Sequence, residues 1–533
     1  MRKFNTTGNC IPSLHYMVDL TSRLKEVRRM IDDGDYFTIN RARQYGKTTL
    51  LHALSKNLKD AYYVISLDFQ ELSASKFCTE ETFSRAFASR FSRALKKANV
   101  SIPDTLMEAL RVFDQKASDK TYTFELMELF DAIGDICAAS DKKLVLMIDE
   151  VDSATNNQVF LDFLAQLRSD YIRRMEQPTF QSVILAGVYD VKNLKRKLRP
   201  EDEHKVNSPW NIAADFNVDM SFHPDDIAGM LEEYRRDHNC SFETDFAAQL
   251  IYDYTEGYPF LVSRMCQIID EQLLGKENFE TSDKAWGLRG IDEAARQIET
   301  EKNTLFESLI SKLVNSKELK DIIKRILFNG AEIPYVAMNP AIEQATMFGF
   351  IREKDGKAVV ANRIFETVLY NLLLTAPEEQ KHEIWKAGEI AKPTFIKNGQ
   401  LDVDLILEHF VATFDDLYGD RDQKFVEEDG RRYFLLYLKP IINGTGNYYI
   451  ESRTRNNERT DIIIDYLGRQ YIIELKIWRG NSYNTRGEQQ LTEYLDFYHL
   501  NKGWMLSFCF NKNKKIGIKT VSVVGRTLVE AVV

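Results

Sequence analysis

Gly46, Lys47, Thr48 and Thr49 could together bind a phosphate group. They follow a short apolar segment, residues 36–40, and lead into the helical sequence LLHALSKNL. A glycine lets the backbone approach the phosphates, and the N–H groups of a helix start attract an anion. Lys47 would place a positive charge near the β- and γ-phosphates, and the Thr48 hydroxyl could bind Mg²⁺. The pattern predicts a phosphate site; the alternative is a basic loop before an ordinary helix.

This loop differs from the P-loop pattern at one position. The pattern is G-x-x-x-x-G-K-[ST] between a strand and a helix, and Arg41 stands where the first glycine would be. The matched half keeps the chemistry of the motif, so we expect ATP to bind there. The residues expected to contact the nucleotide are Arg43, Gln44, Tyr45, Gly46, Lys47, Thr48 and Thr49.

Two carboxylates further along the chain could complete this site. Asp149 and Glu150 end an apolar segment, residues 144–148. Asp149 would hold Mg²⁺ together with Thr48, as a Walker B aspartate does, and Glu150 would polarise the attacking water as a general base. The alternative is an acidic strand end that caps the next helix, because Asp and Glu favour helix starts. Asp152 is interpreted only as helix N-terminal charge.

A third group of residues near the C-terminus could bind a divalent metal. Asp461 begins one predicted strand, and Glu474 and Lys476 lie on the next strand, after a turn. Residues two apart share one face of a strand. Two converging carboxylates could hold Mg²⁺ or Mn²⁺ against a phosphodiester, and Lys476 could stabilise the anion that forms. An exposed Glu474–Lys476 ion pair with no catalytic role is the alternative.

Apolar segments alternate with helical patterns over the first third of the chain. The predicted strands are residues 36–40, 62–69, 144–148 and 183–188, and the predicted helices include residues 82–97 and 123–139. Short buried strands that alternate with helices predict an α/β fold with a mostly parallel sheet. Because the strand at 62–69 falls between the two phosphate-site motifs in the chain, we expect an extra strand to separate the motif strands.

The middle of the chain has helical spacing. Helices are predicted at residues 225–238, 245–255 and 260–274, with a break at Gly257-Tyr258-Pro259. Strands at 348–353 and 358–362 flank an Asp-Gly turn, which predicts a hairpin and a winged-helix-like module. Few basic residues lie on this hairpin, so packing is favoured over DNA binding. Residues 376–391 are predicted to be a connector.

Residues 37–49 resemble the R-x-R-x-x-G-K-[ST] loop of the bacterial AAA-ATPase-like family, in which arginine replaces the first glycine as Arg41 does. The sequence SPWNIAADF at 208–216 resembles the S-P-F-N-I-A-x-x-F signature of the same family. The likeness covers roughly residues 1–270. It implies a P-loop ATPase with a helical lid, in which Arg264 sees the nucleotide and Tyr189 or Asp190 senses the γ-phosphate; a solvated helix face and a plain loop are the alternatives.

Asp461, Glu474 and Lys476 form a D-x(n)-E-x-K hairpin that resembles the PD-(D/E)XK nuclease superfamily, over about residues 395–525. The resemblance implies an α/β restriction-endonuclease-like domain. It also implies an acidic metal ligand from a preceding helix, for which Glu428 is the candidate, and a Q-x-x-x-Y motif on the following helix, matched by Gln490 and Tyr494. No proline precedes Asp461, in contrast to the superfamily pattern. A degenerate nuclease fold that only binds remains open.

Composition limits the partners and the compartment. The formal net charge is −10, yet residues 431–533 have a basic excess, which fits a nucleic-acid partner, DNA first, or a solvated surface. The chain has no signal-like segment and no apolar run of about 18 residues, so no membrane span is expected. The six cysteines are scattered without a C-x-x-C pair, which fits reduced thiols and a cytoplasmic protein.

These observations predict an AAA-like ATPase coupled to a metal-dependent nuclease, with ATP and Mg²⁺ (or Mn²⁺ at the nuclease site) as cofactors. The alternative is an ATP-dependent switch or scaffold whose nuclease-like domain only binds. A homo-oligomer is compatible with either. The predicted domains are an ATPase core at 1–220, a helical lid at 221–284, a helical and winged-helix-like linker at 285–390 and a nuclease-like domain at 391–533.

Overall fold

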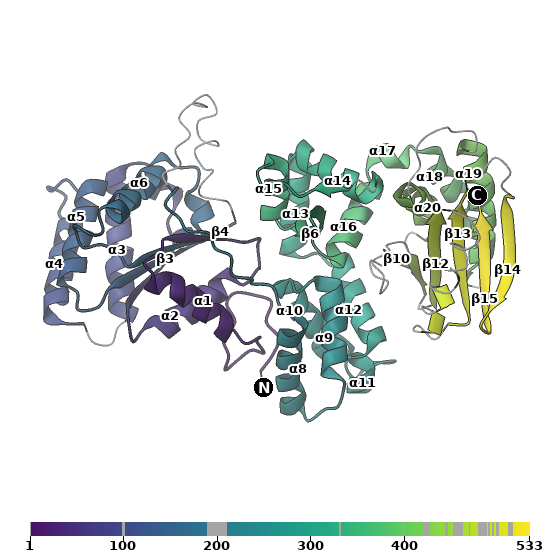
Figure 1. The fold of residues 1–533 in the computed structure, drawn as a ribbon, viewed down its shortest axis with the longest axis horizontal. Helices are drawn as coiled ribbons and strands as arrows, with labels where there is room; N and C mark the ends of the chain where they lie inside the picture. The colour runs from purple at the N-terminus through teal and green to yellow at the C-terminus, as the bar shows by residue number, and fades with distance from the viewer. Residues whose placement is uncertain are drawn as a thin grey trace. The chain divides into compact units, whose positions relative to one another are not determined.

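The computed structural model forms two compact units, Met1–Ile298 with Met347–Gly349, and Glu299–Thr346 with Phe350–Val533 (Figure 1). Each unit is described by itself, and the four predicted domain boundaries stay predictions. The described residues are 2–98, 102–188, 210–329, 332–397, 399–418, 427–442, 446–450, 462–467, 469–477, 488, 491–492, 495–496, 500–509 and 515–533.

The first unit contains a parallel four-stranded sheet, which confirms the predicted α/β fold. Its order is β1-β4-β3-β2. The strands are β1 (Phe37–Asn40), β2 (Tyr63–Asp68), β3 (Leu144–Asp149) and β4 (Ser182–Gly187). A strand does separate β1 from β3, but it is β4, which follows β3 in the chain; β2 forms an edge of the sheet. Both motif strands therefore end on the same side of the sheet, because all four strands run in one direction.

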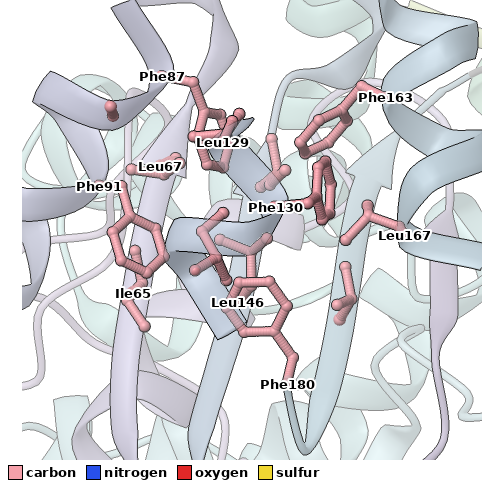
Figure 2. Packing of buried hydrophobic residues seen from close by; sticks show 14 of the residues in the cluster. Ile65, Leu67, Phe87, Phe91, Leu129, Phe130, Leu146, Phe163, Leu167 and Phe180 are labelled. Carbon is pink, nitrogen blue, oxygen red and sulfur yellow. The ribbon is translucent and has the colours of Figure 1, made fainter. Parts of the chain in front are cut away.

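Helices cover both faces of this sheet, so its strands are largely buried, although Ser66 and Asp68 of the edge strand β2 are exposed. Helices α1 (Thr21–Asp32) and α2 (Lys47–Leu58) pack on one face. Helices α3 (Glu80–Ala98), α4 (Asp104–Ser118), α5 (Leu126–Ala139) and α6 (Gln158–Ile172) pack on the other. Figure 2 shows the second core, in which Phe87, Phe130 and Phe163 pack together with aliphatic residues of the strands. Helix α4 was not among the predicted elements.

A helical segment, called the lid from here on, follows the sheet, and its predicted role as a lid stays a prediction. It contains α8 (Pro224–His238), α9 (Thr244–Thr255), α10 (Pro259–Ile268), a π-helical turn η5 (Ile269–Leu273), α11 (Ser282–Ala285) and α12 (Leu288–Thr300). The predicted helix at 260–274 is thus an α-helix that ends in a π-turn. Gly257 has a φ of +70°, and a Cβ there would lie 2.1 Å from the Phe222 carbonyl oxygen, so this turn requires glycine.

The second unit begins with a helical module that carries a hairpin. Its elements are α13 (Thr304–Asn315), α14 (Lys317–Asn329), β5 (Ile333–Pro334), α15 (Pro340–Met347), β6 (Ile351–Lys354), β7 (Lys357–Val360) and α16 (Arg363–Leu374). Strands β6 and β7 pair antiparallel around Asp355 and Gly356, whose φ angles are +51° and +77°. Two consecutive positive φ angles are typical of a tight hairpin turn. The predicted hairpin is therefore present.

The prediction of a connector at 376–391 is wrong for its C-terminal part, residues 383–391, because these residues form a packed helix. Residues 376–391 contain α17 (Pro377–Gln380) and α18 (Glu383–Ala391). A Cβ at Gly388 of α18 would lie 2.1 Å from the carbonyl oxygen of Tyr437, in α20 (Glu427–Ile442). Glycine thus lets the two helix backbones pack closely. Helix α19 (Val403–Tyr418) precedes α20.

A six-stranded mixed sheet ends the chain. Its strands are β10 (Gly446–Ile450), β11 (Ile462–Tyr466), β12 (Arg469–Ile477), β13 (Lys502–Phe508), β14 (Gly517–Val523) and β15 (Arg526–Val532), in the order β10-β11-β12-β13-β15-β14. Strands β10, β11 and β12 pair antiparallel, and β13 lies parallel to both β12 and β15. The predicted hairpin of β11 and β12 is confirmed in its described part.

Within the described residues, no helix has both the length and the apolar character that a membrane span requires.

Candidate functional site

The phosphate loop lies between β1 and α2, at the carboxyl end of the parallel sheet. Gly46 precedes α2 with a φ of +83°, in the left-handed region that favours glycine. Gln44 also has a positive φ, of +56°. Such a tight loop before a helix start is typical of anion sites, because its N–H groups converge. The structure therefore brings the predicted loop residues into one turn.

The ammonium group of Lys47 is held inside this loop. Its Nζ donates to the carbonyl oxygens of Arg41, at 2.9 Å, and Ala42, at 3.0 Å. Lys47 is only 7% exposed. Burial lowers the pKa of this lysine, and the nearby carboxylates of Glu150 and Asp152 oppose that shift. Lys47 is thus a desolvated cation beside the loop amides.

Thr48 and Asp149 meet directly, although they come from different motifs. The Thr48 hydroxyl donates to Oδ2 of Asp149 at 2.6 Å, and the backbone N–H of Glu150 donates to Oδ1 of Asp149 at 2.9 Å. Asp149 is buried at the end of β3. A hydroxyl and a carboxylate side by side form the oxygen donor set that Mg²⁺ prefers. The two residues fit the predicted metal site.

Glu150 lies at the same end of the sheet, with a strained backbone and a carboxyl group whose pKa is raised. Its φ is +52°, which is uncommon for a non-glycine residue and is often found at functional sites. Burial raises the pKa of its carboxyl, and the neighbouring Asp149 raises it further. A carboxylate with a raised pKa is a stronger base, which suits the role predicted for Glu150.

Asp68 joins this acidic group and was missed by sequence reasoning. It ends β2, and the register of the sheet places it directly beside Asp149. Burial raises the pKa of Asp68, and Asp149 adds to the effect. Its position could have been inferred, because the carboxyl ends of neighbouring parallel strands meet at one edge.

Arg41 has a structural role in this unit. Its guanidinium donates to the carbonyl oxygen of Val218 at 3.0 Å and lies over the Phe216 ring, 5.3 Å from the centroid. The side chain at the position of the missing glycine therefore contacts Phe216, the last residue of the second family signature, and Val218, which follows that signature.

Asp152 also does more than supply helix N-terminal charge. Its Oδ2 accepts the backbone N–H of Val188 at 2.7 Å, just after β4. A Cβ at Gly187 would lie 2.8 Å from Oδ1 of Asp152. Asp152 thus joins the ends of β3 and β4. The predicted sensors, Tyr189 and Asp190, lie outside the described residues.

Tyr258 links the lid to the phosphate loop, and sequence reasoning missed it. Its hydroxyl donates to the carbonyl oxygen of Arg43, and its ring meets that of Tyr45 edge-on with centroids 4.8 Å apart. Arg264, the predicted lid contact, donates to Gln267 of its own helix at 2.8 Å, and its predicted role toward the nucleotide stays a prediction. The only sequence signal for Tyr258 was its place in the Gly-Tyr-Pro entry to α10.

A largely apolar cavity of about 340 Å³ adjoins the loop. It is lined by three segments: the N-terminal stretch, the phosphate loop and the lid. Among its lining residues are Gly8, Cys10, Gly46, Thr49, Pro259 and Phe260. The N–H of Cys10 donates to the Thr49 hydroxyl at 3.1 Å, which fastens the N-terminal stretch to the loop. Sequence reasoning gave the N-terminal stretch no role.

In the second unit, Glu474 and Lys476 form a buried ion pair. Nζ of Lys476 lies 2.7 Å from Oε1 of Glu474, and Lys476 and Glu474 are 4% and 0% exposed, respectively. The expected alternative of an exposed surface pair is therefore wrong in its exposure. Strand register places Glu474, Met505 and Glu530 in one row across the sheet.

A helical segment packs on the face that carries this pair. Gly503 shares a face with Met505, and a Cβ at Gly503 would lie 3.1 Å from Cδ1 of Leu491. Asp461 and Gln490 lie outside the described residues. Glu428 belongs to α20, but its side chain is also outside the described part. Their predicted roles stay predictions. In the described part of the chain, no three His, Cys, Asp or Glu side chains gather into a metal-binding group.

Comparison with solved structures found weakly similar folds of low identity. A Walker-type ATPase of Pyrococcus abyssi is 16% identical, with a TM-score of 0.47, over 69% of this chain and 99% of its own. The ORC2 protein of Aeropyrum pernix is 11% identical, with a TM-score of 0.35, over 67% and 95%. The RuvB Holliday junction branch migration motor of Thermotoga maritima is 12% identical, with a TM-score of 0.32, over 64% and 90%. A search of curated proteins found no match.

Comparison with family models assigns the chain to a family, which the distant likeness to these structures does not do. Residues 11–371 match the family described as an AAA-like domain, which is more than half of the chain. The matched range includes the phosphate loop, both carboxylates after β3 and the helical lid. The chain therefore belongs to the AAA-like domain family, as a P-loop ATPase.

Proposed function

We propose that the first unit hydrolyses ATP with Mg²⁺ and that the nuclease-like domain of the second unit, residues 391–533, is a metal-dependent nuclease. ATP positions or gates its cleavage of nucleic-acid phosphodiesters. The hydrogen bond between Thr48 and Asp149 is the observation that best supports the ATPase half. It joins the loop motif to the carboxylate motif at one point of the sheet.

The residues of the first unit divide the work of phosphoryl transfer. Lys47 and the N–H groups from Arg43 to Thr49 bind the phosphate charge, and Thr48 with Asp149 holds the metal. Mg²⁺, when bound, neutralises charge on the phosphate oxygens. Glu150 accepts the proton of the attacking water, for which its raised pKa suits it. The apolar cavity beside Gly46 takes the base of the nucleotide.

The nuclease half is supported by the geometry of β11 and β12. Ile462 pairs with Ile473, so the residue after Ile473, Glu474, lies at the end of the hairpin where Asp461 enters it in the chain. We propose that Asp461 and Glu474 hold Mg²⁺ or Mn²⁺ with Glu428, that Lys476 stabilises the phosphodiester anion and that Gln490 assists from the following helix. The proposed partner is nucleic acid, DNA first, and the protein could act as a homo-oligomer.

One observation favours the alternative, an ATP-dependent switch or scaffold with a non-catalytic second unit. Lys476 neutralises Glu474 directly, at 2.7 Å and away from solvent. A buried ion pair can be retained for specificity of packing alone. The nuclease proposal and the switch or scaffold alternative differ in whether Glu474 binds a metal ion.

Two activity measurements test this proposal. ATP hydrolysis is measured for wild type, Lys47→Ala and Glu150→Gln, and cleavage of DNA and RNA with Mg²⁺ or Mn²⁺ is measured for wild type and Glu474→Gln, with and without ATP. We expect Glu150→Gln to bind ATP without turnover, and Glu474→Gln to lose cleavage but keep ATPase activity. ATP turnover without any cleavage by wild type would favour the switch, and a wild type without ATP turnover would refute the ATPase half.

A further inference from the structure

Helix α3 carries a row of cations along one face. Arg90, Arg93 and Lys97 are spaced three and four residues apart, so they lie on the same side of the helix. Lys96 and Arg85 flank this row. Three of the five cations have acidic partners: Arg85 pairs with Glu81, Arg90 with Glu71 and Lys96 with Asp114. Among the described residues, Arg93 and Lys97 have no ion-pair partner.

Arg93 and Lys97 line two separate hollows, one on each side of α3. The first, of about 430 Å³, lies between α2 and α3 across the end of the edge strand β2, and Thr48 and Asp149 also line it. The second, of about 800 Å³, lies along α3 toward α4. Both cations belong to the lining of both hollows. The two side chains thus lie on a ridge between two depressions.

Beside the cations, the second hollow contains one carboxylate, Asp114, which pairs with Lys96, whereas the first contains Asp68, Glu71 and Asp149. Hydroxyl side chains accompany the cations: Ser55 and Ser66 in the first hollow, and Ser89, Ser92 and Ser118 in the second. Arginine, lysine and serine are the side chains that most often contact nucleic-acid phosphates. The charge of a helix C-terminus accounts for Lys96 and Lys97 in the last turn of α3, but it does not account for Arg93, which lies five residues before the end of the helix.

We propose that the ridge of Arg93 and Lys97 binds the phosphate backbone of a nucleic acid, whose strand runs along α3 with phosphates in the second hollow, because the carboxylates of the first hollow repel phosphate. The cations of the second hollow extend along α3 from Arg85 to Lys97, which suits a polymer of phosphates better than a single small anion. The ridge also borders the first hollow, which reaches Thr48 and Asp149, so the bound strand lies near the ATPase site. This inference uses the nucleic-acid partner of the proposed function, but it requires neither cleavage nor ATP turnover.

The test is direct binding of a short fluorescein-labelled DNA duplex to the full chain in EDTA, read by anisotropy across a salt series. The variant is Arg93→Ala with Lys97→Ala. The matched control is Lys25→Ala with Arg29→Ala, which removes two exposed cations with the same spacing from α1, on the opposite face of the sheet. Thermal unfolding of both variants checks that each is folded.

We expect the α3 variant to bind about tenfold or more weakly and to lower the salt slope by about 1.8, at about 0.9 for each phosphate that the protein no longer neutralises. The α1 control should bind as wild type does. Equal losses of affinity in both variants, or no change in the slope for the α3 variant, would overturn the proposal. Competition by polyglutamate as strong as that by unlabelled DNA would assign the ridge to an acidic protein instead. A change of oligomeric state on sedimentation with unchanged DNA binding would assign it to a subunit contact.

Loss of binding in the α3 variant can be told apart from failure of the proposed function. If wild type binds DNA but never cleaves it, the ridge proposal stands and the nuclease proposal falls. If Glu474→Gln abolishes cleavage while DNA binding and its dependence on Arg93 and Lys97 persist, both stand.

Discussion

The hydroxyl of Thr48 lies 2.6 Å from Oδ2 of Asp149, and these two residues come from different strand ends of the first sheet. Thr48 lies in the first turn of α2, whereas Asp149 ends β3, and β4 lies between β3 and the loop strand β1. The parallel sheet brings the two residues together because every strand ends at the same edge.

Lys47→Ala should weaken ATP binding by a few kcal/mol, since charge-assisted contacts to phosphate are among the strongest hydrogen bonds. Calorimetric titration with ATP measures the change in affinity. Lys56→Ala, in the same helix but outside the loop, is the control and should bind normally. Unchanged affinity in Lys47→Ala would refute the assignment of this loop to phosphate. Thermal unfolding accompanies the titration, because the variant also leaves the Arg41 and Ala42 carbonyls without their donor.

Arg41 should contribute to the stability of the fold, whereas Arg43 should not. Arg41→Ala removes the hydrogen bond to the Val218 carbonyl and should lower the free energy of unfolding by about 1.5–3 kcal/mol, as for hydrogen bonds that involve a charged group. Arg43 is exposed, so Arg43→Ala should keep stability within about 0.5 kcal/mol. Urea unfolding of both variants measures the difference. Equal stability of the two would mean that Arg41 does not anchor the segment at Val218.

The fold of the first unit could be predicted because its strands are short, apolar and separated by helical spacing. The lid and the hairpin at Asp355 and Gly356 were visible for similar local reasons. Helix α4 was not among the helices named from the sequence. Helix α18 looked like a connector because its packing depends on the close approach of Gly388 to Tyr437, which lies far along the chain.

The candidate site could be predicted only where one short segment carries its chemistry. Gly46, Lys47 and Thr48 are consecutive, and so are Asp149 and Glu150. Asp68 and Tyr258 reach the same site from segments with no motif, through strand register and a side-chain contact. Contacts of this kind are fixed by tertiary packing, which a pattern along one segment does not contain.

Tyr258→Phe should loosen the phosphate loop without removing the ring that packs on Tyr45. Removal of the hydrogen bond to the Arg43 carbonyl should cost about 0.5–1.5 kcal/mol. We expect the KM for ATP to rise more than kcat falls, because the change acts on loop geometry. Tyr62→Phe is the matched control, since it deletes a hydroxyl that donates to Asp32 at 2.7 Å. An equal effect of both variants on KM would contradict a role of Tyr258 at the loop.

Glu150→Gln should stabilise the protein without nucleotide at neutral pH. Burial and Asp149 raise the pKa of Glu150, so the folded protein keeps this proton to a higher pH than the unfolded chain does. Stability from this group therefore falls as pH rises through the raised pKa. The melting temperature of the variant should exceed that of wild type at pH 7–8, with about 2–4 °C for each kcal/mol, and the gain should shrink below the ordinary glutamate pKa of about 4.3. A gain that grows toward acidic pH would contradict this sign.

The buried pair of Glu474 and Lys476 makes a prediction that differs from that for an exposed pair. Exposed pairs contribute about 0–1 kcal/mol, and two repelling carboxylates could lose one charge at little cost. Here one charge would remain buried without its partner, 2.7 Å away in the wild type. Glu474→Gln and Lys476→Met should therefore each cost about 3–5 kcal/mol. Lys397→Met, which breaks an exposed pair with Asp402, is the control.

The double variant Glu474→Gln with Lys476→Met separates a structural pair from a metal site. It removes both charges of this pair, so its stability should be closer to that of wild type than either single variant is. If Glu474 holds a metal, Mn²⁺ should raise the melting temperature of wild type but not that of the double variant, because a bound ligand stabilises only the state that binds it. DNA cleavage should be absent from the double variant even though it is folded. A Mn²⁺ stabilisation that survives in the double variant would place the metal elsewhere, and cleavage that survives would exclude both side chains from the reaction.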